Sequence, residues 1–101
     1  MSLKKQFDAK KHVCKVTFTL AKNLTDTAKH INLAGDFNNW DIESIPMKKQ
    51  KDGVFSVSVD LEKCGEYQFK YLLDGKVWIN DKEADKQVLN DFKTKNSVVI
   101  V

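Results

Sequence analysis

The sequence predicts an all-β protein folded as a β-sandwich. Residues 12–20, 53–61 and 65–73 alternate apolar and polar side chains with a period of two, which is the pattern of a half-buried strand. Turn-forming residues separate these stretches, and apolar side chains at helical spacing are sparse. About seven short strands divided by turns, in a chain of 101 residues, are typical of a β-sandwich with one hydrophobic core.

Each long predicted strand has one apolar face. Residues 1–10 precede the first strand and are expected to form a flexible or edge segment. The apolar faces of the first two long strands are Cys14, Val16, Phe18 and Leu20, and then Phe55, Val57, Val59 and Leu61. Shorter strands are expected at residues 31–34, 77–79 and 97–101, and the best helical candidate is a turn or two near residues 82–87.

The hairpin around Asp74 and Gly75 decides which side chains share a face of the third long strand. A two-residue turn would pair Tyr71 with Trp78 and would mix polar and apolar side chains on both faces. A three-residue loop, Leu73-Asp74-Gly75, instead separates the faces, with the pairs Tyr71 and Val77, Phe69 and Ile79, and Lys70 and Trp78. The core face is then Tyr67, Phe69, Tyr71, Val77 and Ile79, and the outer face is Gln68, Lys70, Leu72 and Trp78. An exposed Trp beside a Lys predicts a ligand, because large aromatic side chains are normally kept from water.

Composition and charge exclude several classes of function. No apolar run approaches the roughly 18 residues that span a bilayer, and we expect no secretory signal in the first residues. The chain carries 17 basic and 14 acidic residues, and its one basic cluster, residues 47–51, is expected to be a solvated turn. Two cysteines are too few for a disulfide framework. We therefore expect a cytoplasmic protein whose partners include no membrane and no nucleic acid.

The sequence shows no catalytic constellation. His12 and His30 are the only histidines, and neither has a Ser/His/Asp, Cys/His or metal-ligand spacing. The carboxylates form no evident pair of the kind that glycoside hydrolysis requires, and no glycine-rich phosphate loop is present. We therefore predict a protein that is not an enzyme and that uses no cofactor and no metal.

Two tryptophans and nearby polar groups fit the chemistry of a sugar site. A sugar ring offers a C–H face that packs on an aromatic ring, and a rim of hydroxyls that needs directional donors and acceptors. Trp40 ends the turn-forming segment that starts at Gly35, and Asn96 lies just before the last predicted strand. Structural interpretations stay open: Trp78 could pack on the sheet, Trp40 could cap the end of the sandwich, and Asn96 could satisfy a turn.

Three segments, taken in order, resemble carbohydrate-binding module family 48. They are Gly35-Asp36-Phe37-Asn38-Asn39-Trp40, the stretch from Gly65 to Trp78, and Asn96-Ser97-Val98-Val99. The family includes the isoamylase N-terminal domain and the glycogen-binding domain of the AMP-activated protein kinase beta subunit, and the resemblance covers about residues 13–101. It implies an immunoglobulin-like (early set) β-sandwich of about seven antiparallel strands, as a single glycogen-binding-type domain over residues 1–101. By position, it implies glucan contacts from Trp40, Lys70, Trp78 and Asn96.

Two departures from the family pattern fall near these residues. The kinase-type domain has its Trp one residue closer to the Asp-Gly turn, whereas Val77 intervenes here, as in the bacterial enzyme-type domains. Those bacterial domains tend to carry Pro and Gly in the stretch occupied here by residues 89–94, so any contact from Phe92 or Thr94 depends on the shape of this loop.

The sequence therefore predicts a stand-alone, non-catalytic module that binds α-1,4-linked glucan, either a polysaccharide such as glycogen or starch or a maltooligosaccharide. Its expected role is to localise or regulate a partner enzyme, such as a glycoside hydrolase, a branching enzyme or a kinase. The alternative is a protein-interaction domain of such an assembly that binds no sugar.

Overall fold

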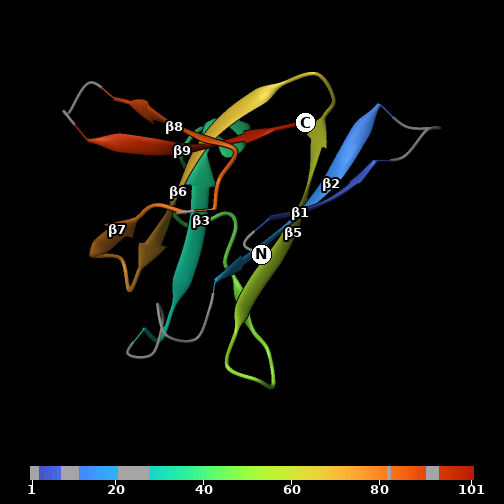
Figure 1. Ribbon diagram of the computed structural model, residues 1–101. Helices are drawn as coiled ribbons and strands as arrows, with labels where there is room; N and C mark the ends of the chain where they lie inside the picture. The colour runs from blue at the N-terminus through green and yellow to red at the C-terminus, as the bar shows by residue number, and fades with distance from the viewer. Residues whose placement is uncertain (1–2, 8–11, 21–27, 82, 91–93) are drawn as a thin grey trace.

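Two antiparallel sheets pack face to face in the computed structural model, which describes residues 3–7, 12–20, 28–81, 83–90 and 94–101 (Figure 1). The first sheet has the order β1-β2-β5-β4, with β1 Leu3–Phe7, β2 Val13–Leu20, β5 Phe55–Glu62 and β4 Lys48–Lys49. The second has the order β3-β6-β9-β8, with β3 Ile31–Gly35, β6 Glu66–Leu73, β9 Lys95–Ile100 and β8 Lys86–Leu89. Strand β7, Val77–Ile79, pairs with β6, and the short 3₁₀ helix η1, Asp36–Asn38, follows β3. The predicted all-β sandwich is confirmed.

The core lies between the sheets and is built from the predicted apolar faces. The four apolar side chains of β2, from Cys14 to Leu20, are buried, as are Phe55 and Leu61 of β5. The Phe18 ring packs edge-on against Phe69 of the opposite sheet, with ring centroids 5.1 Å apart. Alternation along β2 and β5 therefore places one face of each strand toward the core and the other toward solvent. Among the described residues, no helix has the length and apolar character needed to cross a bilayer.

The predicted register of the β6–β7 hairpin is wrong. Leu73 pairs with Val77, Leu72 with Trp78 and Tyr71 with Ile79, so the loop is Asp74-Gly75-Lys76. Asp74 and Gly75 both have positive φ, at 52° and 68°, and the Lys76 N–H donates to the Leu73 carbonyl at 3.0 Å. The two left-handed residues close the turn one position later than expected, and Lys76 is the additional loop residue.

Two residues of this hairpin differ from the prediction in their solvent exposure. Val77 shares the parity of the core face but is 55% exposed, whereas Ile79 on the same face of β7 packs against the core. Leu72 belongs to the outer face but is 3% exposed, because Asn32 and Trp78 lie opposite it on the two neighbouring strands. The shift preserves the parity of pairing, so the other side chains keep their predicted faces.

Three segments without a clear sequence pattern are also strands. The helix expected near residues 82–87 is wrong for its described part, since Lys86 and Gln87 begin β8 and pair with β9; Lys82 lies outside the described residues. Strand pairing supplies long-range hydrogen bonds that the weak local preference does not reveal. Strand β1 lies at the edge of the first sheet. The solvated turn expected for residues 47–51 is wrong in part, since Lys48–Lys49 pair with β5 and Met47 is buried.

Candidate functional site

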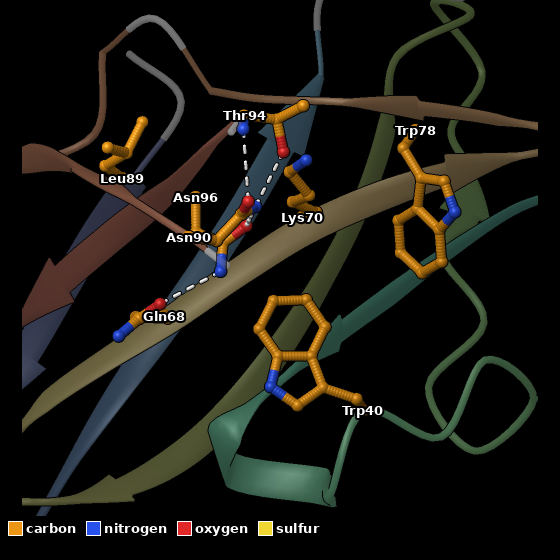
Figure 2. A pocket seen from close by; sticks show the side chains of 8 residues that line it. All are labelled: Trp40, Gln68, Lys70, Trp78, Leu89, Asn90, Thr94 and Asn96. Atoms are coloured by element: carbon orange, nitrogen blue, oxygen red, sulfur yellow. Dashed lines mark hydrogen bonds between the residues drawn. The ribbon is translucent and has the colours of Figure 1, made fainter. Parts of the chain in front are cut away.

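A surface hollow of about 790 Å³ lies over the outer face of the second sheet. The side chains that line it are Trp40, Gln68, Lys70, Trp78, Leu89, Asn90, Thr94 and Asn96 (Figure 2). All four residues predicted from the sequence to contact a ligand, Trp40, Lys70, Trp78 and Asn96, are therefore brought together. They come from the loop after η1 and from strands β6, β7 and β9, so the fold rather than the local sequence assembles the hollow.

Strands β6 and β7 present the lysine and one tryptophan. Trp78 is 44% exposed, as predicted, so it does not belong to the core. It lies opposite Leu72, not opposite Lys70 as the predicted register had it. Lys70 is two positions before Leu72 on the same face of β6. Lys70 and Trp78 are therefore diagonal neighbours, a spacing that long and aromatic side chains can bridge.

A tightly bonded loop presents the other tryptophan. Asn38 holds the loop together: its Oδ1 accepts from the Gly35 N–H at 3.0 Å, and its Nδ2 donates to the Asp41 carbonyl at 3.0 Å. Phe37 turns inward, with its ring centroid 5.9 Å from that of Phe18. The Trp40 side chain turns toward the hollow, and the main-chain N–H of Trp40 donates to the Gly35 carbonyl at 2.9 Å. The segment thus points one aromatic side chain into the core and the other at the hollow.

The backbone of this loop is unusual at two positions. Asn39 and Trp40 both have φ of 57°, in the left-handed region that bulky side chains rarely adopt. Such a conformation costs on the order of 1–3 kcal/mol and persists only where surrounding contacts fix it. Gly35 is required for a different reason, because a Cβ there would clash with the Gln68 carbonyl oxygen of β6. Close approach of β3 and β6 therefore sets the starting point of the loop.

A row of amide side chains lies along one side of the hollow. Asn96 Nδ2 donates to Gln68 Oε1 at 2.9 Å, and Asn90 Nδ2 donates to Asn96 Oδ1 at 2.9 Å (Figure 2). Asn90 Nδ2 also donates to Thr94 Oγ1 at 2.7 Å, and Asn90 Oδ1 accepts from the Thr94 N–H at 3.1 Å. Asn96 lies inside β9 with 9% exposure, so it is a member of this row and not a turn residue. The row holds directional donors and acceptors in place for a polar ligand.

A second polar network lies beneath the site and fixes the connection from β7 to β8. Asp81 is 2% exposed, and its Oδ2 accepts from Tyr71 Oη at 2.8 Å. The Asp81 N–H donates to Ser97 Oγ at 2.8 Å, and the Asp81 carbonyl accepts from Gln87 Nε2 at 2.8 Å. Burial, and then the negative charge of Asp81, raise the pKa of the Tyr71 hydroxyl far above its ordinary value, so Tyr71 remains a donor.

The lining groups favour binding over chemistry. Among the described residues that line the hollow, Lys70 is the only charged one and no carboxylate is present. Glycoside hydrolysis usually requires two carboxyl groups on either side of the bond that breaks. The described residues also contain no group of three or more His, Cys, Asp or Glu side chains that could hold a metal ion. The arrangement can stack flat apolar faces and hydrogen-bond neutral hydroxyls.

Four lining residues were not predicted as contacts from the sequence. Gln68 was placed on the outer face without a role, and Asn90 carried no distinguishing pattern. Thr94 had been considered together with Phe92, which lies outside the described residues. Leu89 is 72% exposed at the end of β8. A sequence signal for strand β8 would have been needed to predict Leu89 as a contact.

The two-layered β fold with an aromatic, amide-lined hollow on one sheet defines a sugar-binding type of module. In agreement, residues 15–101 match the model of a family described as the glycogen recognition site of AMP-activated protein kinase. The match covers more than half of the chain, so the protein belongs to this family of carbohydrate-binding modules. A comparison with individually curated proteins found no significant match.

Proposed function

We propose that this protein binds α-1,4-linked glucan, such as glycogen, starch or a maltooligosaccharide, in the hollow on its second sheet, and that it catalyses no reaction. The observation that carries the proposal is the meeting of two tryptophans from different elements at one hollow that also holds four amide and hydroxyl side chains. Membership of a glycogen-recognition family supports the same ligand.

The placement of the tryptophans favours a curved chain over a flat one. Trp40 comes from the loop after η1 and Trp78 from β7, so the indoles do not form a straight row along one strand (Figure 2). An α-1,4 glucan curves, and aromatics on different elements can contact successive rings of such a chain. The hydroxyl rims then meet the amides of Gln68, Asn90 and Asn96, which supply neutral donors and acceptors.

A module that catalyses no reaction would act by keeping a partner enzyme at the polymer. We propose that it is cytoplasmic and that it brings a glucan-active partner, such as a glycoside hydrolase, a branching enzyme or a kinase, to the polymer or regulates it there. A domain that serves only to bind another protein would leave the aromatic hollow without a sugar ligand, and this alternative is tested by the same measurement.

The test is calorimetry with maltoheptaose, β-cyclodextrin and cellohexaose on the wild type and on Trp40→Ala and Trp78→Ala. Truncating a stacking aromatic in a binding site costs about 2 kcal/mol or more, so each variant should bind maltoheptaose roughly thirtyfold more weakly. Phe7→Ala is the matched control, because it removes an aromatic side chain that is 60% exposed on edge strand β1. Cellohexaose bound as tightly as maltoheptaose, or folded tryptophan variants that bind like the wild type, would refute the proposed site.

A further inference from the structure

The side chain of Asp36 joins the Trp40 indole to strand β6. Its Oδ1 accepts a hydrogen bond from Trp40 Nε1 at 3.0 Å, and its Oδ2 accepts one from the Gln68 N–H at 2.9 Å. The two carboxylate oxygens thus serve two donors that are far apart in the sequence. Asp36 does not itself line the hollow, whereas Trp40 and Gln68 both do.

The contact with Asp36 orients the Trp40 ring, whereas the other hydrogen bond described for Trp40 involves its main chain. The backbone hydrogen bonds of the loop fix the Trp40 main chain, but the ring can still rotate about two side-chain torsions. A hydrogen bond from the indole N–H to a carboxylate is charge-assisted, and it defines the direction of the ring plane. The second bond, from the Gln68 main chain, fixes the carboxylate against a strand of the sheet.

A carboxylate suits this position better than any other short side chain. Both donors are N–H groups, so the bridging residue must supply two acceptor atoms at once. An ionised Asp has two acceptor oxygens and no donor, whereas Asn would turn an NH₂ group toward one of the two N–H groups. A hydroxyl side chain has only one oxygen atom and cannot match the two separate contacts.

We infer that Asp36 is a positioning residue that holds the Trp40 ring in its binding orientation and occupies its indole N–H. Trp40 therefore offers a ligand only its ring face, while recognition of hydroxyls falls to Lys70 and the amide row. The inference rests on the proposed function, since the ligand is the α-glucan of that same hollow. It adds a determinant of affinity that makes no contact with sugar.

The first measurement needs no sugar. In a ¹H–¹⁵N spectrum, Trp40 and Trp78 give two indole N–H signals, assigned with Trp40→Phe. The Trp40 signal of the wild type should exchange more slowly with solvent than it does in Asp36→Ala, by about threefold or more, because its N–H is held by a carboxylate. Asp41→Ala is the matched control: it removes the same charge from the same loop, and among the residues that the structure describes the Asp41 carboxylate accepts from the Glu43 N–H and not from an indole.

The second measurement is a mutant cycle with maltoheptaose. Asp36→Ala should weaken binding by about three- to tenfold, the size of effect expected from ordering one large side chain on binding. In a Trp40→Phe background the aromatic face remains but the N–H is gone, so Asp36→Ala should change the affinity by less than twofold. A role of Asp36 in the fold alone would weaken binding equally in both backgrounds.

The outcomes separate this inference from the proposed function. A wild type that binds no α-glucan overturns both. Glucan binding by the wild type, combined with equal effects of Asp36→Ala in the two backgrounds or with an unchanged Trp40 exchange rate, overturns the inference alone. Where Asp36→Ala does not fold, Asp36→Asn takes its place, since it retains one acceptor and should show the same pattern with a smaller effect.

Discussion

Tyr71 and Asp81 form a buried hydrogen bond beneath the hollow, and its loss should destabilise the protein more than the loss of a similar bond near the surface. Tyr71 Oη lies 2.8 Å from Asp81 Oδ2, and both residues are buried. The other oxygen, Asp81 Oδ1, accepts from the Glu83 N–H at 2.9 Å. Tyr71→Phe therefore removes a hydrogen bond from Oδ2 while the carboxylate stays buried.

The size of the effect follows from the charge of the acceptor. A hydrogen bond to a charged group contributes about 1.5–3 kcal/mol, so Tyr71→Phe should lower the free energy of unfolding by about 2 kcal/mol. Tyr67→Phe is the matched control on the same face of β6, where Tyr67 Oη donates to the Glu62 carbonyl at 3.1 Å at an exposed position. That bond is neutral, and its loss should cost about 0.5–1 kcal/mol. The difference corresponds to about 5–10 °C in Tm for a domain of this size.

Urea denaturation followed by circular dichroism measures both variants. Because the folded pKa of Tyr71 is raised above that of the unfolded chain, the stability linked to its proton is fully present below about pH 10. It is lost as the pH rises above that value, so the wild type should lose stability between about pH 10 and 12 more steeply than Tyr71→Phe. Equal destabilisation by Tyr71→Phe and Tyr67→Phe at neutral pH would show that the carboxylate adds nothing to the bond.

Three further outcomes are expected. Hydrogen bonds from the main-chain N–H groups of His30 and Lys29 lower the pKa of Asp74 in the folded protein. Its contribution to stability is therefore present above about pH 4 and is lost as the pH falls through the lower, folded pKa. In Asp74→Asn, the free energy of unfolding should fall less steeply as the pH is lowered below about 4. Asn90→Ala should weaken maltoheptaose binding about fivefold in calorimetry, because the hydrogen bond that orients Asn96 contributes about 1 kcal/mol. Gln50→Ala removes an amide that bonds Ser56 of the other sheet, and it should leave binding unchanged. Gly35→Ala should lower the free energy of unfolding measured in urea by about 1–3 kcal/mol, because the added methyl group would press against β6.

The sequence predicted the faces of the long strands well because alternation is a local property. In β2, every second residue from Cys14 to Leu20 is buried, and this can be seen in eight consecutive residues. Trp78 was placed on the correct face although its partner was wrong, since the real register differs from the predicted one by an even step. An error of one residue would have put Trp78 in the core and removed the site from the prediction.

What the sequence did not show depends on contacts between distant segments. Strand β8 forms because Lys86–Leu89 pair with β9, while its own residues have a mixed preference. The roles of Gln68 and Asn90 depend on hydrogen bonds to Asn96, which brings β6, the end of β8 and β9 together. No spacing along the chain reveals an amide row that crosses three strands.

The two hydrogen-bonded groups of the site have a shared consequence for binding. Asp36 holds the Trp40 ring, and Gln68 and Asn90 hold Asn96 from two sides. A side chain that is already ordered loses less entropy when a ligand arrives, by about 0.5–1.5 kcal/mol for each flexible group. Trp40 and the amide row therefore form a preordered part of the hollow, and Asp36, Gln68 and Asn90 are the residues whose loss should raise the entropy cost of binding.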